Sequence, residues 1–369
     1  MRHSTYLEVN LNHFADNFYK VEKMVQGASI MPMIKADAYG NGLIPITQFV
    51  NQELKVKSIG CASLSEAIKI YQDFPDFLGE ILVFSDVELR DEKIRRAYLD
   101  YNIIPVIHNR FDLDLMLSVP ELATIPLVLK INTGMNRLGL SLDDLVQCAT
   151  RLKLRGVRHL MSHFSCSYYP IKPGDKTNRQ YDEFKKAKQL LQNASVEVIE
   201  TSMANSAAIE QGFALNETHV RPGLMLYGPA SVENGAWQGN QISRLVTKVI
   251  RASIIKKGTP VGYGVHVAGE DCYMVVLPIG YGDGIMTFYS GVELWINGFK
   301  AKIFGRVNMD MTFLAFDPSV EGKIREGDVV EFWGHDRRTI SDIAAQMNTH
   351  PYQIMCAISG RIPRIYKVR

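Results

Sequence analysis

The feature that most constrains the fold is a repeated alternation of short apolar runs and longer amphipathic stretches, from about Asn10 to Tyr227. The apolar runs are typical of buried strands, and the stretches between them are typical of helices. This number of strand–helix units predicts a (β/α)8 barrel, although an open doubly wound sheet has the same local pattern. The strand-like runs are 30–34, 57–62, 80–84, 103–107, 126–131, 159–163, 196–200 and the segment ending at 228, and the helix-like stretches include 64–74, 142–154 and 178–193, with Ser63 and Ser141 as N-caps of the first two.

The pattern changes after about Ala230, where short runs separated by glycines replace the helical periodicity. These runs cover 245–255, 272–279, 292–296, 300–304 and 328–333, and one short helix is expected at 340–347. A chain of 369 residues favours two domains. We therefore predict an α/β plus β protein, with an N-terminal (β/α)8 TIM barrel over residues 10–230 and a C-terminal mainly-β domain over residues 231–369, on which residues 1–9 could also pack.

Composition excludes several classes of partner. Hydrophobic residues make up 46% of the chain and charged residues 22%, with a formal net charge of +2, so neither a nucleic acid nor a membrane is expected to bind. The five cysteines are scattered without metal-ligand spacing, which is typical of reduced cytosolic thiols, and no metal is expected. The first six residues contain no apolar signal region and no run is long enough to cross a membrane, so we expect a cytoplasmic protein.

Lys35 is the first candidate for chemistry, because it ends an apolar run at the point where parallel α/β folds place their active sites. An ammonium group there is poorly solvated, which lowers its pKa and favours the neutral amine needed for Schiff-base formation or proton abstraction. Gly40 and Gly42 would let the backbone approach a ligand closely. A lysine that merely reaches out of a barrel mouth into solvent would have the same local pattern.

Other segments carry groups suited to small anions. Arg137 lies in the turn-rich segment 130–139, and its planar guanidinium can bind both oxygens of a carboxylate, although a structural salt bridge is equally compatible. Residues 201–207 offer hydroxyls and backbone N–H groups at the start of a helix, which suit a phosphate dianion. His163 follows an apolar run and by itself would be a core histidine.

Residues 35–42, Lys-Ala-Asp-Ala-Tyr-Gly-Asn-Gly, resemble the pyridoxal-phosphate lysine motif of the alanine racemases, with Asn41 where histidine is usual. Segments 130–139, 201–207, 221–228, 258–264, 280–284, 305–311 and 351–364 resemble further motifs of that family in the expected order. The resemblance implies an alanine racemase that interconverts L-alanine and D-alanine with pyridoxal 5'-phosphate and supplies D-alanine for peptidoglycan synthesis.

The resemblance also assigns roles to individual residues. It implies that the cofactor is attached to Lys35 and bound by Tyr39, His163, Asn205, Ser206, Arg221, Gly223, Leu224 and Tyr352. It implies that the substrate is bound by Arg137, Met309 and Tyr263, with Lys130, Asp310 and Tyr281 in support. Lys130 is the position often found carbamylated, where its negative charge would orient the arginine. Asn132 stands where the family usually has aspartate, and Ser202 stands where it often has histidine. The groups that support Arg137 and Arg221 are therefore expected to differ from those of the family.

Arg221 carries the most specific mechanistic implication, because in the family it faces the pyridine nitrogen of the cofactor. A guanidinium is not a usable proton donor, so the ring nitrogen stays unprotonated and the ring is a weaker electron sink. That arrangement suits an enzyme that only moves one proton.

Inversion of a stereocentre needs a base on each face, and the resemblance implies Lys35 for one face and Tyr263 for the other. A phenol has an unperturbed pKa of about 10 and needs help to ionise, for which His163 and Arg221 are candidates. In the family this tyrosine reaches the cofactor of the partner subunit, so the resemblance implies a head-to-tail homodimer with shared sites.

Three alternatives remain at this point. An amino-acid decarboxylase on the same barrel would need an acidic partner at the ring nitrogen, which Arg221 disfavours. A non-catalytic cofactor-carrying protein would consist of the barrel alone, which the β domain with Tyr263 disfavours. A racemase for serine or a broader set of amino acids is compatible with the sequence, because one methylene or hydroxyl changes discrimination only modestly.

Overall fold

The computed structural model describes residues 4–233, 235–334 and 338–368. Residues 1–3, 234, 335–337 and 369, which fall within the expected domain ranges, lie outside the described part. The chain divides into two compact units. The barrel unit comprises Ala15–Ala38 and Leu43–Gly239, and the sheet unit comprises Met1–Phe14, Tyr39–Gly42 and Asn240–Arg369.

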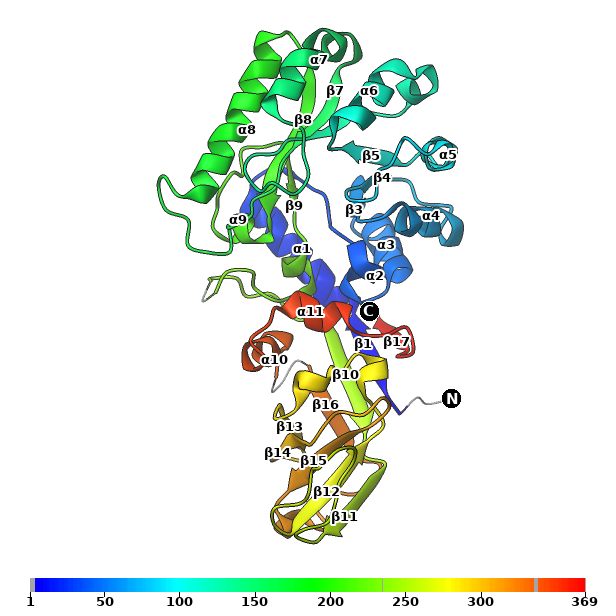
Figure 1. Cartoon of the computed structure of the whole chain (residues 1–369), viewed down its shortest axis with the longest axis vertical. Coiled ribbons are helices and arrows are strands. Elements are labelled where there is room, and N and C mark those ends of the chain that lie inside the picture. Colours follow the sequence, from blue (N-terminus) through cyan, green and yellow to red (C-terminus); the bar gives the residue numbers. More distant parts are fainter. Residues whose placement is uncertain (1–3, 234, 335–337, 369) are drawn as a thin grey trace. The chain divides into compact units, whose positions relative to one another are not determined.

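The barrel unit contains an eight-stranded parallel sheet in the order β2-β9-β8-β7-β6-β5-β4-β3 (Figure 1). Its strands are β2 (Ser29–Ile30), β3 (Ser58–Cys61), β4 (Glu80–Val83), β5 (Ile104–Ile107), β6 (Val128–Lys130), β7 (Val157–Met161), β8 (Val198–Asn205) and β9 (His219–Arg221). A parallel bridge between Met33 and Gly60 joins the two ends of this sheet. The predicted (β/α)8 barrel, with a mainly-β second domain, is therefore confirmed.

Apolar side chains fill the inside of the barrel. One buried cluster takes residues from four neighbouring strands, β4 to β7, and from the segment just after β2, which is how barrel interiors are packed. Its members are Met31, Leu82, Ile104, Val106, Val128 and Met161, with Phe84 packed against them. Because side chains alternate along a strand, residues two positions before or after these point to the same side. This places His159 of β7 on the inner face, below Met161 and toward the amino end of the strand.

Helices cover the outside of the barrel strands (Figure 1). They are α3 (Leu43–Gln52), α4 (Leu64–Asp73), α5 (Glu92–Asp100), α6 (Arg110–Ser118), α7 (Leu142–Arg155), α8 (Lys176–Asn193) and α9 (Ser206–Glu210). Helix α1 (Leu11–Val25) begins in the sheet unit. The segment α2 (Lys35–Tyr39) is a separate short turn. Short 3₁₀ turns lie at Pro120–Thr124 and Leu224–Tyr227. Ser63 and Ser141 are confirmed as N-caps, and each forms a capping box with the acidic residue three positions on. None of the described helices is long and apolar enough to cross a membrane.

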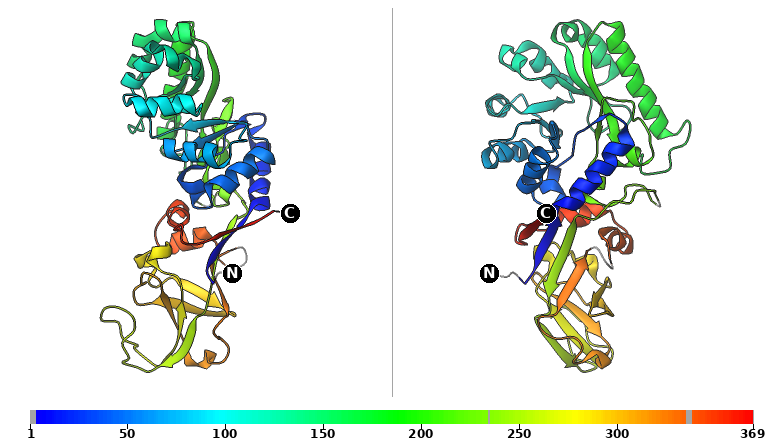
Figure 2. Two further views of the ribbon diagram at one scale, coloured as in Figure 1. Left: turned by 90° about the vertical axis from the view of Figure 1, so that its right-hand side faces the viewer. Right: turned by 180° about the vertical axis from the view of Figure 1, so that it is seen from behind.

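The sheet unit is built on a nine-stranded sheet in the order β11-β12-β15-β14-β13-β16-β10-β1-β17. Its strands are β1 (Tyr6–Asn10), β10 (Ser243–Lys248), β11 (Arg251–Ile255), β12 (Cys272–Leu277), β13 (Glu293–Ile296), β14 (Phe299–Phe304), β15 (Thr312–Phe316), β16 (Val329–Trp333) and β17 (Arg364–Lys367). Figure 2 shows the blue β1 running beside the yellow-green β10, and the register pairs it with β17 on its other side.

The sheet unit differs from the sequence prediction in two details. The run 245–255 is not one strand, because the chain leaves β10 at Val249 and Ile250 before β11 begins. The expected single helix is wrong in number, since α11 (Pro351–Cys356) follows α10 (Ile340–Gln346). Short 3₁₀ turns lie at Tyr281–Asp283, Thr287–Tyr289 and Pro318–Val320.

Candidate active site

Lys35 lies where the first barrel strand ends, and the chain then takes a rare conformation. Ala36, Asp37 and Ala38 have φ of 51–54° and ψ of 46–55°, and Tyr39 has φ 53°. These residues form a left-handed helical turn, which L-amino acids normally avoid. The backbone N–H of Ala38 still donates to the carbonyl of Ile34 at 2.9 Å, so the turn is closed. It carries the chain sharply away from the lysine and leaves that side chain at the carboxyl end of the strands.

Side chains from the turn and from α4 hold this conformation. The Asp37 carboxylate accepts the backbone N–H of Leu43 at 2.7 Å, at the start of α3. The backbone N–H of Asp37 donates to Glu66 Oε1 at 3.2 Å. The other oxygen of Glu66 accepts from the backbone N–H groups of Ala62 and Ser63 at 3.0 and 3.3 Å. The capping box of α4 therefore also anchors the turn behind the lysine.

Four basic side chains act on one another at the carboxyl ends of the barrel strands. Lys130 ends β6 and is 7% exposed. Burial, followed by the positive charges of Arg137, Arg221 and Lys35, lowers its pKa to about 8. Burial, followed by the positive charges of these four basic side chains, holds the pKa of His163 well below its usual value. The group therefore has an excess of positive charge, which suits an anionic ligand.

Arg137 lies in a compact loop between β6 and α7. Asn132 Oδ1 accepts the backbone N–H groups of Gly134 and Asn136, both at 3.1 Å, and the Asn132 side-chain N–H donates to Asn136 Oδ1 at 2.9 Å. Gly139 closes the loop with φ 138°, where a Cβ atom would lie 2.4 Å from the backbone nitrogen of Asn132. Asn132, the departure noted in the sequence, thus shapes the loop that presents the exposed Arg137 side chain.

Arg221, the last residue of β9, is 4% exposed, and burial lowers its pKa to about 10. Its guanidinium donates to Ser202 Oγ and to the backbone carbonyl of Ser162. Ser202 Oγ lies 2.7 Å from His159 Nε2, and His159 Nδ1 lies 3.4 Å from Glu200 Oε2. A serine plus a histidine from the neighbouring strand therefore occupies the space behind Arg221, where the family often has one histidine.

An arrangement suited to phosphate lies between β8 and the turn after β9. Ser206 Oγ accepts the backbone N–H of Gly223 at 2.9 Å, and Leu224 begins the following 3₁₀ turn. Asn205 caps α9 by accepting the backbone N–H of Ala208 at 3.1 Å. Ser206 Oγ accepts from Gly223 and keeps its own hydroxyl proton to donate, and hydroxyl and backbone N–H groups of this kind are the donors that phosphate groups bind. The residues present therefore fit a phosphorylated cofactor.

The remaining expected residues belong to the sheet unit. The rings of Tyr39 and Tyr352 pack with centroids 5.6 Å apart. Gly40 sits so close to α11 that a Cβ atom would lie 2.1 Å from the carbonyl oxygen of Met355. Arg364 donates to the Gly40 carbonyl at 3.0 and 3.2 Å. The glycine after Tyr39 therefore allows a backbone contact that aligns the two tyrosines.

Tyr263 lies in a loop closed by a bridge between Pro260 and Val267 and is 72% exposed. Gly262 and Gly264 have φ of 65° and 89° and form the tight turn around it. An exposed phenol on such a loop is available to a second molecule.

Tyr281, Met309 and Asp310 lie together on neighbouring turns of the sheet unit. The backbone N–H of Gly282 donates to the Met309 carbonyl at 2.9 Å. Arg361 donates to Asp310 at 2.6 Å. The structure thus groups these three residues, as it groups the basic residues of the barrel unit.

Two features escaped the sequence reasoning. Glu66 holds the turn after Lys35, and only its capping-box position pointed to it. His159, Glu200 and His219 place their ligand-type atoms within 4.8 Å of one another. The only sequence signal for these three residues is that each lies within a predicted barrel strand, on three strands that follow one another in the chain.

Comparison with known proteins identifies relatives over the whole length. The family model described as the alanine racemase N-terminal domain matches residues 9–231, and the one described as the C-terminal domain matches residues 242–366. The chain is 33% identical to an alanine racemase of Carboxydothermus hydrogenoformans and 31% identical to one of Alcanivorax borkumensis, covering 97% and 98% of this chain and 98% of each relative. Its fold is similar to the crystal structure of alanine racemase from Bartonella henselae with covalently bound pyridoxal phosphate, with a TM-score of 0.89, 22% identity, and coverage of 99% of this chain and 100% of that one.

Proposed function

The chain belongs to the alanine racemase family, and from this membership we propose that it interconverts L-alanine and D-alanine with pyridoxal 5'-phosphate. The observation that carries the proposal is Lys35 at the carboxyl end of the barrel strands, among the basic side chains that lower the pKa of Lys130. The product D-alanine would serve peptidoglycan synthesis. The five cysteines are all free, which supports a cytoplasmic location.

The bound cofactor would acidify the α-proton of the amino acid by conjugation with its amino group. Lys35 would hold the cofactor covalently, and Asn205, Ser206 and the backbone of Gly223 and Leu224 would bind the phosphate, with Tyr39 and Tyr352. His163 stays neutral because its pKa is low, so it can pack near the ring without adding charge.

Arg221 would face the ring nitrogen. Even with its lowered pKa of about 10, the guanidinium stays protonated at neutral pH and cannot give up a proton. One N–H of each terminal guanidinium nitrogen is donated, to Ser202 Oγ and to the Ser162 carbonyl, which fixes the side chain in one orientation. A fixed cation in that position would disfavour a proton on the ring nitrogen of the bound cofactor and suit chemistry limited to proton transfer.

Arg137 and the backbone N–H of Met309 would bind the substrate carboxylate. Lys130 would support Arg137 after carbamylation, which requires a neutral amine. A pKa of about 8 gives this lysine a larger neutral fraction at physiological pH than an exposed lysine has. Tyr281 and Asp310 would line the path by which the substrate enters.

Lys35 and Tyr263 would remove and return the α-proton on opposite faces. Lys35 would exchange protons with the D-amino acid and Tyr263 with the L-amino acid. The strong exposure of Tyr263 supports a homodimer in which this phenol completes the site of the partner subunit.

The first test combines cofactor labelling with an activity panel. Borohydride reduction of the holoenzyme should fix the cofactor to the peptide that contains Lys35, and Lys35→Ala should abolish the labelling. Racemisation measured over several amino acids should be fastest with alanine. Labelling of another lysine, or the absence of alanine racemisation by the labelled protein, would contradict the proposal.

The second test separates the two bases. Tyr263→Ala should slow racemisation by about 10²–10⁴-fold, because a positioned acid–base group contributes that much. Exchange of the α-proton with deuterated solvent should persist for D-alanine and be lost for L-alanine. Tyr19→Phe, at another exposed tyrosine, is the matched control and should change neither rate. Equal loss of exchange from both antipodes would mean that one base serves both faces.

A third test addresses the homodimer. Lys35→Ala and Tyr263→Ala proteins, each nearly inactive, should regain activity after subunit exchange, because a mixed dimer contains one intact site. Failure to regain activity after confirmed exchange would place both bases of a site in one subunit.

A further inference from the structure

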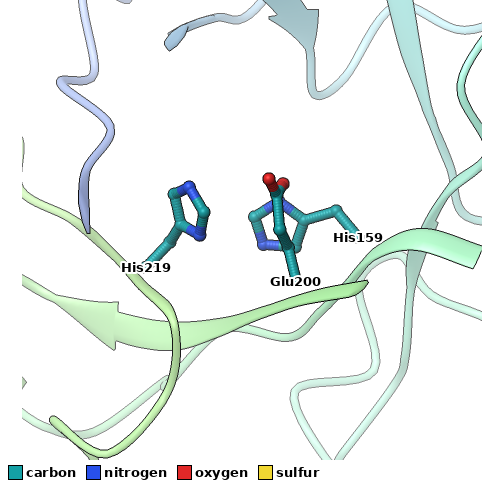
Figure 3. Close-up of side chains that lie close together, drawn as sticks. All are labelled: His159, Glu200 and His219. Carbon is teal, nitrogen blue, oxygen red and sulfur yellow. The ribbon is translucent and has the colours of Figure 1, made fainter. Parts of the chain in front are cut away.

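A cluster of three ligand-type side chains lies inside the barrel, toward the amino ends of its strands and one layer below Arg221. His159 of β7, Glu200 of β8 and His219 of β9 come from three successive parallel strands, and Figure 3 shows the carboxylate and both rings gathered around one space. One ligand atom from each lies within 4.8 Å of the others. None of the three takes part in the proposed racemisation.

His159 has an unused nitrogen. The side chain is 1% exposed, and its Nε2 lies 2.7 Å from Ser202 Oγ. Its Nδ1 is buried and makes no hydrogen bond to any residue of the described chain, although Glu200 Oε2 is 3.4 Å away. A buried polar atom whose nearest acceptor is too far away for a good hydrogen bond is poorly satisfied, and a ligand between His159 Nδ1 and Glu200 Oε2 would satisfy both atoms.

The hydrogen bonds of His219 determine which of its nitrogens is available. Thr218 Oγ1 donates its single proton to the Thr201 carbonyl at 3.0 Å and accepts the Thr201 N–H at 2.7 Å. His219 Nδ1, 2.9 Å from the same hydroxyl, must therefore be the donor. The proton on Nδ1 leaves the lone pair of Nε2 free to bind a ligand.

We propose that His159, Glu200 and His219 bind a divalent transition-metal ion of the zinc type, with water completing the coordination. Two imidazoles and one carboxylate form a donor set that zinc takes in proteins, with ligand bonds of roughly 2.0–2.2 Å. Tetrahedral bonds of that length place neighbouring ligand atoms about 3.4 Å apart, which matches the distance from His159 Nδ1 to Glu200 Oε2. The three ligand atoms lie within 4.8 Å of one another, so small movements of the side chains would complete the site.

The groups around the cluster orient its ligands. Arg158 lies 2.7 Å from Glu200 Oε1, which leaves Oε2 facing His159. A metal on His159 Nδ1 places the ring proton on Nε2, which then donates to Ser202 Oγ. Oxygen lone pairs of that serine accept from His159 and from Arg221 together. Such outer hydrogen bonds to metal-bound histidines are typical of metal sites.

The cluster is also open on one side. The Glu200 side chain is 17% exposed and His219 is half-buried, while Thr218 beside it is exposed. An ion and its water can therefore enter from the amino-terminal face of the barrel, opposite to the end that carries Lys35 and Arg221.

The test is a cobalt titration of the full-length holoenzyme after dialysis against a chelator. Co²⁺ should bind at one ion per chain with the visible absorption bands of a tetrahedral complex, and Zn²⁺ should displace it. Bound metal is counted independently by elemental mass spectrometry. A holoenzyme that takes up neither ion would overturn the proposal.

Two variants assign the ligands. His219→Asn keeps an N–H donor for Thr218 but removes Nε2, and Glu200→Gln keeps the shape of the side chain but removes the charge. Each should weaken cobalt binding by at least about 10-fold, since even outer-shell changes cost that much. His108→Asn is the matched control, because His108 Nδ1 also bonds a neighbour, the Val106 carbonyl at 3.1 Å, outside the cluster.

The variants are compared only after circular dichroism and thermal melting of the metal-free proteins show that they are folded. If one variant does not fold, the other carries the assignment. Affinity equal to that of the unmodified protein in a folded His219→Asn or Glu200→Gln variant would overturn the proposed site.

Discussion

Replacement of Ala36 by glycine should stabilise the protein, against the usual effect of glycine in a helical turn. Ala36 is exposed and has φ 54° and ψ 55°, so its side chain contributes little packing while its backbone sits in the left-handed region. That conformation costs an L-residue roughly 1–2 kcal/mol, and glycine avoids it. Glycine loses about 0.5–1 kcal/mol more in backbone entropy than alanine. The net gain in the free energy of unfolding is therefore about 0–1.5 kcal/mol, with a midpoint of roughly 0.75 kcal/mol.

The matched control is Ala149→Gly in the middle of the right-handed α7. Because that backbone has negative φ, glycine only adds entropy to the unfolded chain and should lower the free energy of unfolding by about 0.5–1 kcal/mol. Urea unfolding of both variants, followed by far-UV circular dichroism, measures the difference directly. If Ala36→Gly is destabilised as much as Ala149→Gly, the turn after Lys35 is not left-handed in solution.

Three further perturbations test the groups around the site. Ser202→Ala should lower the free energy of unfolding in urea by about 1–3 kcal/mol, because a buried N–H of Arg221 loses its acceptor. Ser202→Thr keeps the hydroxyl and should retain most of the stability. An alanine variant of unchanged stability would mean that another acceptor is in reach of Arg221. In carbonate-free buffer the free energy of unfolding should rise by up to about 3 kcal/mol from pH 8 to pH 10.5. Lys130 has a pKa of about 8 when folded and about 10.5 when unfolded, so the unfolded chain binds more protons in that window. Lys130→Met should flatten this pH profile, and an unchanged slope would show that other groups cause it. Glu66→Ala should cost about 0.5–1.5 kcal/mol and weaken cofactor retention, measured by dialysis, because the exposed N–H of Asp37 loses its acceptor. Glu66→Gln, which keeps an oxygen, should lose less, and equal losses would show that the charge alone matters.

The barrel could be predicted because each strand and helix carries its own periodic pattern, and the N-caps Ser63 and Ser141 carry a local chemical signal. The sheet unit was less accessible, since β15 and β17 gain their identity from pairing with distant strands rather than from sequence pattern. The left-handed turn could not be predicted at all. Ala36 and Ala38 have no preference for positive φ, and one aspartate between them is a weak signal. One contact that holds the turn comes from Glu66, far along the chain.

The candidate site shows the same division. Motifs named its residues one by one, because each motif lies within a few consecutive positions. His159, Glu200 and His219 stayed hidden because their proximity depends on the register of three strands rather than on any local spacing. Sequence order gives no indication that the unbonded nitrogen of His159 faces a carboxylate.

The position of β1 in the sheet unit sets the order in which this protein can mature during its synthesis. β1 is synthesised before the barrel strands, yet its neighbours are β10 and β17, and Leu7 pairs with Arg364. At roughly 5–20 residues per second, the first strand waits on the order of 20–70 s for its last partner. The barrel strands, whose neighbours mostly follow one another in sequence, can pair during that interval. The nascent chain therefore carries β1 as an unpaired strand while the whole barrel is made, and chaperones that shield extended apolar segments should bind there.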